Sequence, residues 1–174
     1  MTDRTRGTSA HREAAQATAA RCAVVVVSDS RTEQTDESGP LARRLLEEAG
    51  HSVVHGVLLA NDEARVRDEV SKLITRDDVD VVILSGGTGL GTRDRTVEAV
   101  RPLLEKELPG FGELFRWVSY KEQIGTAAIL TRALAGTANK TLIVSLPGSK
   151  KAVDLALKEV LLPELKHLLH ELTR

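Results

Sequence analysis

Residues 80–94, DVVILSGGTGLGTRD, join an apolar run to a glycine-rich loop, and a helical pattern follows directly. The glycines of the loop are Gly86, Gly87, Gly89 and Gly91. Glycine allows positive φ and a close approach of the backbone to a ligand, and the start of a helix offers unpaired N–H groups to an anion. We therefore predict a strand, a phosphate-binding loop and a helix in this order. Asp94, at the end of the loop, is available to a metal ion or a hydrogen bond.

Apolar strands alternate with amphipathic helices on both sides of this segment. The run Cys22–Ser28 contains four consecutive valines, which is typical of a strand buried on both faces of a parallel sheet. Strands are predicted for residues 22–28, 51–59, 80–84 and 141–146. Helices are predicted for residues 41–49, 61–74, 96–108, 123–134 and 150–174, with a further helical pattern from Pro109. This alternation predicts an α/β fold of three layers, in which helices flank an open, mostly parallel sheet.

The length of 174 residues suits one domain with a substantial core. Residues 1–20 contain no large apolar side chain after Met1, so we expect a flexible tail there, with a short surface helix from Ala10 to Ala20. Residues 21–174 are expected to form the domain.

The composition excludes several classes of protein. The formal net charge of −1 gives no electrostatic footprint for nucleic acid or for an anionic membrane. No apolar run approaches the roughly 18 residues that span a bilayer. The single cysteine, Cys22, cannot form an internal disulfide, which fits a reducing compartment. We therefore expect a cytoplasmic protein.

Polar loops follow four predicted strands. They are Ser28–Thr32, Asn61–Glu63, Ser85–Asp94 and Pro147–Ser149. The carboxyl ends of parallel strands meet at one edge of a sheet, and ligands bind there in open α/β folds. We therefore predict one convergent pocket that all four loops line.

The glycine loop does not fit the commonest phosphate motifs. No Gly-Lys-Ser/Thr follows the glycines as in a P-loop, and Thr92 stands at the third glycine position of a dinucleotide fingerprint. The five histidines show no metal-ligand spacing with Cys22, and no Gly-x-Ser-x-Gly elbow is present. The remaining interpretation is a site for phosphate chemistry that uses backbone amides, hydroxyls, carboxylates and Mg²⁺.

All aromatic residues of the chain lie within ten positions, and they are Phe111, Phe115, Trp117 and Tyr120. The spacing of four places Phe111 and Phe115 on the same helix face. These side chains could pack the edge of the core or a subunit interface, or they could form a wall against which a flat heterocycle stacks. The apolar side of the last helix likewise serves either the core or an oligomer contact.

Several motifs in order carry a resemblance to a known family. They are Ser28-Asp29, Asp36 with Gly39, Asp62-Glu63, Gly86-Gly87-Thr88-Gly89, Arg93-Asp94 with Thr96, Pro109-Gly110-Phe111 with Arg116 and Ser119, Gly125-Thr126-Ala127-Ala128, Arg132-Ala133 with Ala135-Gly136, and Leu146-Pro147-Gly148-Ser149. Over residues 21–165 the chain resembles the molybdopterin adenylyltransferases of molybdenum cofactor biosynthesis. This is the Mog/MoaB-like group related to one domain of gephyrin.

The resemblance implies a fold, a reaction and an assembly. The terminal phosphate of molybdopterin would attack the α-phosphorus of ATP, giving adenylyl-molybdopterin and pyrophosphate, with Mg²⁺ required. The family forms homotrimers or pairs of trimers (homohexamers), and a downstream molybdenum insertion protein receives the product. Asp62 and Asp94 would be the catalytic carboxylates and the candidate Mg²⁺ ligands. Substrate and phosphate contacts are implied for Ser28, Asp29, Ser85, Gly86, Gly87, Thr88, Gly89, Arg93, Ser119, Ser145, Pro147, Gly148 and Ser149.

Two alternatives stay open at this point. Asp62 and Asp94 each precede a predicted helix, where aspartate is also a preferred N-cap. The protein could moreover bind and pass on molybdopterin without catalysis. Retention of both carboxylates favours the enzyme, since a binder of an anionic pterin gains nothing from them.

Overall fold

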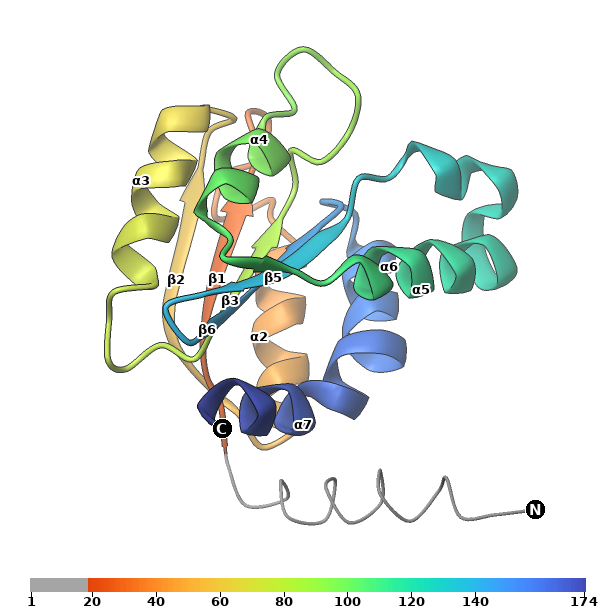
Figure 1. The fold of residues 1–174 in the computed structure, drawn as a ribbon. Helices are drawn as coiled ribbons and strands as arrows, with labels where there is room; N and C mark the ends of the chain where they lie inside the picture. Colours follow the sequence, from red (N-terminus) through yellow and green to blue (C-terminus); the bar gives the residue numbers. More distant parts are fainter. Residues whose placement is uncertain (1–18) are drawn as a thin grey trace, which may run out of the picture.

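The computed structural model describes residues 19–174, which form an α/β fold of three layers (Figure 1). Its six-stranded sheet has the order β2-β1-β3-β6-β5-β4. The strands are β1 (Arg21–Val27), β2 (Ser52–Leu59), β3 (Val81–Ser85), β4 (Lys106–Glu107), β5 (Leu134–Ala138) and β6 (Thr141–Leu146). The first four strands in the spatial order run parallel, whereas β5 and β4 are antiparallel to their neighbours. The predicted fold class is thereby confirmed.

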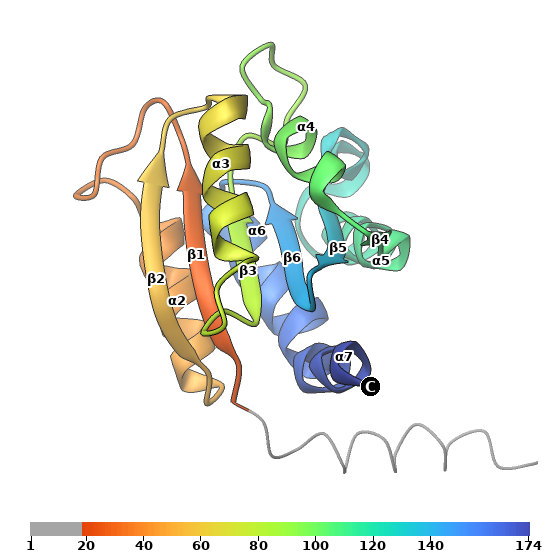
Figure 2. The ribbon, with the colours of Figure 1, turned by 60° about the vertical axis from the view of Figure 1, so that its left-hand side comes forward.

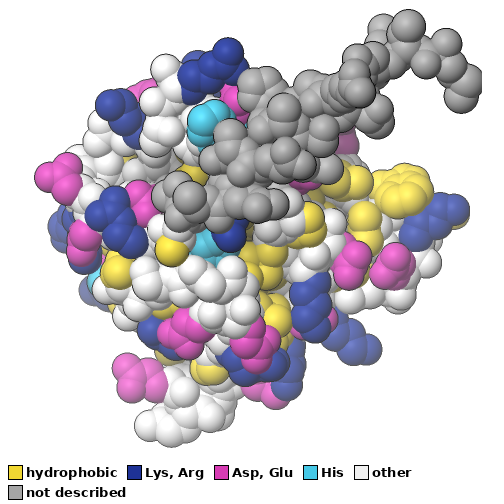
Figure 3. All heavy atoms as spheres, turned by 90° about the horizontal axis from the view of Figure 1, so that it is seen from below, with side chains coloured by type: hydrophobic (Ala, Val, Ile, Leu, Met, Phe, Trp, Pro, Cys, Tyr) yellow, Lys and Arg dark blue, Asp and Glu magenta, His cyan; other side chains and the backbone are white. Residues whose placement is uncertain are grey.

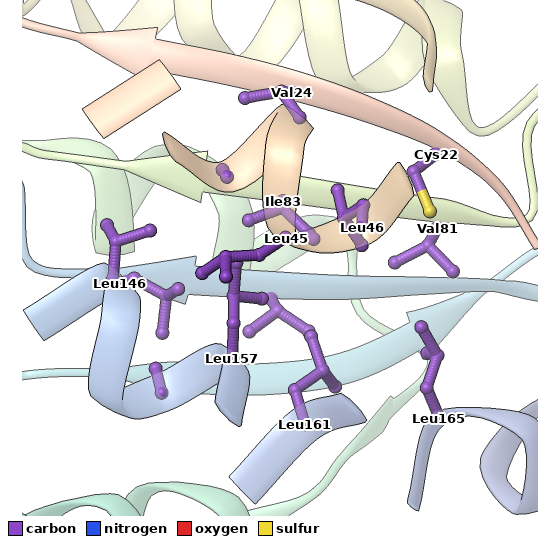
Figure 4. Packing of buried hydrophobic residues seen from close by; sticks show 14 of the residues in the cluster. Cys22, Val24, Leu45, Leu46, Val81, Ile83, Leu146, Leu157, Leu161 and Leu165 are labelled. Atoms are coloured by element: carbon purple, nitrogen blue, oxygen red, sulfur yellow. The ribbon is translucent and has the colours of Figure 1, made fainter. Parts of the chain in front are cut away.

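Helices cover both faces of the sheet (Figure 2). They are α2 (Ser38–Glu48), α3 (Glu63–Leu73), α4 (Thr96–Val100), α5 (Pro109–Ser119), α6 (Lys150–Leu155) and α7 (Leu162–Thr173). Because β1 is buried on both sides, Val24 and Val26 belong to a core with α2, α5, α6 and α7, while Val25 and Val27 belong to a core with α3 and α4. Figure 4 shows the first core, in which Leu45 of α2 and Leu157 lie next to each other over the sheet.

The order of the strands creates a crevice at one edge of the sheet. The chain passes from β1 to β2 on one side and then crosses to β3 on the other side of β1. Connections that leave neighbouring parallel strands in opposite directions open a crevice at their carboxyl ends, where ligands bind. The Ser28–Thr32 loop after β1 and the glycine loop after β3 both begin at this place.

The predicted helix over residues 96–108 is wrong beyond Val100. The chain forms a 3-10 turn at Arg101–Leu103 and then the short strand β4. Pro102 lacks an N–H and cannot continue a helix, which ends α4 early. The N–H groups of Glu105 and Leu108 instead donate to carbonyl oxygens of β5, at 2.8 Å each.

The predicted helix over residues 123–134 is wrong as a continuous α-helix, because of its residues after Ile124 only Gly125–Leu130 are helical, as a 3-10 helix. A π-helical turn at Tyr120–Ile124 is followed by Gly125 with φ of +56°, which an α-helix cannot accommodate. Leu134–Ala138 then forms β5, which pairs with β6 through a two-residue turn at Asn139 and Lys140 with φ of 47° and 64°. Gly136, predicted to end a helix, lies inside this strand.

Ala20 marks the start of the fold within the described residues. It is fully buried, its N–H donates to Nδ1 of His51 at 3.0 Å, and its carbonyl accepts from the N–H of Ser52. The structure does not describe residues 1–18, which include almost all of the predicted tail and of its surface helix.

The surface of residues 19–174 carries mixed charge. Figure 3, seen from below Figure 1, shows Lys and Arg interspersed with Asp and Glu over the described part of this face. No helix in this part of the chain is long and apolar enough to cross a membrane.

Candidate functional site

A cavity of about 1140 Å³ lies at the carboxyl ends of β1, β3 and β6. All four predicted loops contribute to it, through Ser28–Arg31, Asn61, Ser85–Gly89 with Asp94, and Pro147–Ala152. The predicted convergence is therefore confirmed. The opposite wall comes from α5 and the segment after it, with Phe115, Ser119, Glu122, Gln123, Ile124, Ala127, Leu130 and Thr131.

The first two residues of the glycine loop, Gly86 and Gly87, have no room for a side chain. Gly86 has φ of +111°, and a Cβ there would lie 2.1 Å from the carbonyl oxygen of Val27. Gly87 has φ of +65°, and its Cβ would lie 2.2 Å from Oγ1 of Thr96. Glycine is therefore required at both positions for steric and conformational reasons.

Some N–H groups of the loop donate to another residue, and others have no acceptor in the described part of the chain. The N–H of Gly86 donates to the carbonyl of Leu146 at 2.9 Å, so its predicted contact with phosphate is not available in this arrangement. The N–H groups of Gly87, Thr88 and Gly89 have no acceptor among residues 19–174. Consecutive unpaired amides of this kind form an anion-binding concavity.

Asp94 is held inside the loop and does not cap a helix. Its carboxylate accepts from the N–H of Gly91 at 3.0 Å, and α4 has Arg95 at its N-cap position. A Cβ at Gly89 or Gly91 would lie 2.6 or 2.8 Å from Oδ2 of Asp94. The two glycines therefore make room for the carboxylate, which lines the cavity as predicted.

Asp62 does cap a helix. Its side chain accepts from the N–H of Arg65 at 3.0 Å at the start of α3, and it is exposed outside the cavity lining. Its neighbour Asn61 lines the cavity, with an Oδ1 atom that is buried and has no hydrogen-bond partner in the described part of the chain. The sequence prediction gave this position to Asp62, because nothing in Asn61-Asp62-Glu63 shows which side chain turns toward the cavity.

Asp29 ties three loops together. It accepts from the N–H of Asn61 at 3.0 Å and pairs with Nε of Arg93 at 2.9 Å. The hydrogen bond from Asn61 and the charge of Arg93 hold the pKa of the Asp29 carboxyl below its usual range. Arg93 itself is largely exposed and lies outside the lining, so its predicted substrate contact is not made from this position.

The predicted serines have different environments. Ser28 accepts from the N–H groups of its own turn, and Ser149 caps α6 by accepting from the N–H of Ala152 at 3.2 Å. Ser85 and Ser119 are buried and line the cavity, and Oγ of Ser85 has no partner within residues 19–174. Ser145 shares the sheet face of Ile143 and lies outside the lining.

The lining also contains residues beyond those predicted as substrate contacts. They include Arg31, Glu37, Asn61, Phe115, Glu122, Gln123, Ile124, Lys150 and Lys151, of which Arg31 and Asn61 belong to predicted loops and Phe115 to the possible aromatic wall. Two of the basic side chains are paired with carboxylates, Arg31 with Asp36 at 3.3 Å and Lys150 with Glu37 at 3.1 Å. Lys150 and Glu37 are 113 residues apart, so no local pattern in the sequence indicates that they pair.

The aromatic cluster serves the core at one end and the surface at the other. Phe115 is 1% exposed, lies in the core and lines the cavity, and its ring stacks on Phe111 with centroids 6.4 Å apart. Trp117 and Tyr120 are 59% and 50% exposed and do not line the cavity. The alternative of core packing therefore holds for Phe115, and no aromatic wall surrounds the cavity within the described residues.

Comparisons with known proteins agree with this architecture. Residues 23–167 match a family model described as a probable molybdopterin binding domain. The chain is 49% identical over 154 residues to Molybdenum cofactor biosynthesis protein B of Bacillus anthracis, covering 88% of this chain and 91% of that protein. A crystal structure of a Molybdenum cofactor biosynthesis protein B has a TM-score of 0.87 at 48% identity, covering 90% and 98% of the two chains. The tungsten cofactor synthesizing protein MoaB from Pyrococcus furiosus has a TM-score of 0.81 at 36% identity, covering 90% and 99%. The chain therefore belongs to the family of probable molybdopterin binding domains, as the order of its motifs predicted.

Proposed function

We propose that this protein acts in molybdenum cofactor biosynthesis as a molybdopterin adenylyltransferase. A terminal phosphate oxygen of molybdopterin forms a bond to the α-phosphorus of ATP, and the bond from that phosphorus to the bridging oxygen of the β-phosphate breaks. The products are adenylyl-molybdopterin and pyrophosphate. The observation that carries the proposal is the presence of the Asp94 carboxylate and the unpaired amides of Gly87 to Gly89 in one cavity.

The size of the cavity supports a reaction of two substrates. Pockets for one drug-sized ligand typically measure about 300–1,000 Å³. The cavity of about 1140 Å³ exceeds this range, and its lining includes exposed residues such as Asp29, Glu37 and Lys151. This volume supports the proposal that a pterin phosphate and a nucleotide bind together.

The charge of the lining supports the use of a divalent cation. The basic side chains are Arg31, Lys150 and Lys151, and the acidic ones are Asp29, Glu37, Asp94 and Glu122, so the acidic side chains outnumber the basic ones by one. This balance does not neutralise a triphosphate together with a second phosphate. Mg²⁺ is usually bound through one or two carboxylates and substrate phosphates, and the Asp94 carboxylate and the orphaned Oδ1 of Asn61 fit this donor set. When bound, Mg²⁺ would offset negative charge on the phosphates.

The residues of the chain act mainly by alignment. The nucleophile is already an anion, so the reaction needs no covalent enzyme intermediate and no strong base. The amides of Gly87, Thr88 and Gly89 bind and orient phosphate oxygens, because they are fixed donors with no partner in residues 19–174. Such positioning can lower a barrier by about 7–11 kcal/mol when the reacting groups are held in line.

A non-catalytic molybdopterin-binding or carrier protein is the second candidate. It is favoured by the position of Asp62, which caps α3 outside the lining, so that only one of the two expected carboxylates lies in the cavity. Purified protein with molybdopterin, ATP and Mg²⁺ separates the candidates. The enzyme yields adenylylated pterin and pyrophosphate in equal amounts, and an ATP analogue with a methylene between the α- and β-phosphates yields neither. Pterin binding without product from ATP would establish the carrier.

We also propose that the molecule self-associates through the surface of α5 and the segment that follows it. Six apolar side chains there are at least 46% exposed, and they are Leu114, Trp117, Tyr120, Ile124, Ile129 and Leu130. Contiguous exposed apolar side chains mark interaction surfaces. We expect a trimer or hexamer by light scattering coupled to size exclusion, and a monomer after Trp117→Glu; a monomeric native protein would contradict the proposal.

A further inference from the structure

One guanidinium group closes the base of the glycine loop. Nε of Arg132 donates to the carbonyl of Thr88 at 3.2 Å, and Nη2 donates to the carbonyl of Asp94 at 2.9 Å. Nη1 pairs with the carboxylate of Glu98 in the first turn of α4. Arg132 comes from the segment just before β5, which is 38 residues away from Asp94 along the chain. A single side chain thus holds both ends of the segment Thr88–Asp94.

The rest of this segment has little other support. Its tip stands above the sheet in Figures 1 and 2, and Leu90 at the tip is 71% exposed. Within the segment, Asp94 binds only Gly91, by its N–H and by its carboxylate. The segment is also tied to the body by burial of Thr88 and by the pair of Arg93 with Asp29, in which Arg93 is 73% exposed, and directly after Asp94 the side chain of Arg95 pairs with Glu63 of α3. Exposed pairs of this kind contribute about 1 kcal/mol or less.

The beginning of the loop is anchored independently of Arg132. The N–H of Gly86 donates to the carbonyl of Leu146, and the carbonyl of Gly87 accepts from the N–H of Thr96, both at 2.9 Å. Loss of Arg132 therefore leaves Gly86, Gly87 and the start of α4 at Thr96 in place and releases the span Thr88–Asp94 between them.

We infer that Arg132 is a positioning residue for adenylyl transfer, because it fixes the backbone of Asp94 while the N–H of Gly91 fixes the carboxylate. The expected effect of Arg132 on turnover rests on the proposed function. The hydrogen bonds by which Arg132 holds the backbone of Thr88 and Asp94 do not depend on it. The planar fork of arginine reaches two carbonyls and a carboxylate at once, which the single ammonium group of lysine cannot do.

The test compares Arg132→Lys, Arg132→Met and the control Arg101→Met. The control removes another Arg–Glu pair, that of Arg101 with Glu107 at 3.2 Å, which has no contact with the loop. We expect kcat to fall about 10-fold in Arg132→Lys and about 100-fold in Arg132→Met, since small displacements of an aligned group have effects of this size. The dissociation constant for molybdopterin is expected to rise by a smaller factor than kcat falls in both Arg132 variants, because Gly87 stays anchored while Thr88 and Gly89 lie in the released segment. It is expected to stay unchanged in Arg101→Met.

Limited trypsin digestion gives a readout that does not depend on activity. Arg93 and Arg95 flank Asp94, so release of the segment exposes two cleavage sites. Initial cleavage there is expected to rise about 10-fold in both Arg132 variants and to stay unchanged in Arg101→Met, because cleavage follows local opening. Wild-type kcat and wild-type cleavage in Arg132→Lys would overturn the inference, as would equal losses of kcat, pterin binding and thermal stability. If the native protein forms no adenylylated pterin, the proposed function fails, and the digestion alone decides whether Arg132 holds the loop.

Discussion

Gly86 gives the sharpest test of the packing that forms the site. A Cβ at this position would lie 2.1 Å from the carbonyl oxygen of Val27 and 3.1 Å from its carbon, so β1 and the loop must separate in Gly86→Ala. Positive φ costs a non-glycine residue about 1–2 kcal/mol. Overpacking adds about 1–3 kcal/mol, and weakening of the hydrogen bond from Gly86 to Leu146 adds about 1 kcal/mol. We therefore expect the free energy of unfolding to fall by at least about 3 kcal/mol.

Two other glycines provide matched controls for this measurement. Gly50 has φ of +84° with nothing within 4 Å of its Cβ position, so Gly50→Ala isolates the conformational cost of about 1–2 kcal/mol. Gly110 has open space and no positive φ, so Gly110→Ala is expected to be neutral or to stabilise by up to about 1 kcal/mol. Urea denaturation followed by circular dichroism measures all three. If Gly86→Ala destabilises no more than Gly50→Ala, the close approach of the loop to β1 is refuted.

Three further outcomes follow from individual contacts. Ser149→Ala removes the cap that accepts from Ala152 and should lower the free energy of unfolding by about 1 kcal/mol, whereas Ser149→Asp should retain it; equal urea midpoints for both would contradict the capping role. Burial lowers the pKa of His51 below 6.5, so its contribution to stability is complete above 6.5 and is lost as pH falls from there through the lowered folded-state pKa. The urea midpoint of His51→Gln should therefore vary less between pH 7 and pH 5 than that of the native protein, and an equal variation would contradict this role of His51. Asp62→Asn keeps an N-cap for α3 and should reduce turnover less than Asp94→Asn; a larger loss would place the Asp62 carboxylate in the reaction despite its position outside the lining.

The parallel half of the sheet was predictable because each strand carries its own local signal. The valines of β1 and the run Val81–Leu84 are buried on both faces. A continuous run of β-branched residues is typical of a strand in this environment, so the sequence predicts such strands. Glycine and polar residues then mark where each strand ends. The position of the site then follows, because the carboxyl ends of parallel strands meet at one edge of the sheet.

The antiparallel half was not predictable, because its strands depend on partners. LAGTA, the sequence of β5, has two alanines and a glycine and no strong strand preference. Gly136 is required there because a Cβ would lie 2.5 Å from the carbonyl of Lys106 in β4. A contact with a residue 30 positions away leaves no periodic pattern in the sequence. The sequence therefore predicted no strand there, and the helix predicted over residues 123–134 ended where β5 begins.

The candidate site was predicted at the level of loops and less well at the level of atoms. Asp94 lies in the cavity as expected, but Asn61 takes the inward position that was assigned to Asp62. The amide of Gly86 is bonded to Leu146, which only the pairing of β3 with β6 reveals. Arg132 was part of a recognised motif, yet its contacts with the loop appear only in three dimensions.

Turnover of Asp94→Asn tests the central claim most directly. Asparagine keeps the shape of the side chain and an oxygen that can accept from Gly91, so the substitution removes little more than the charge. Adenylylated pterin should form at least about 100-fold more slowly than with the native protein, while the dissociation constant for molybdopterin changes less than about threefold. Native turnover in Asp94→Asn would contradict the assignment of the glycine loop as the phosphate-binding part of an adenylyl-transfer site with Asp94 at its catalytic end.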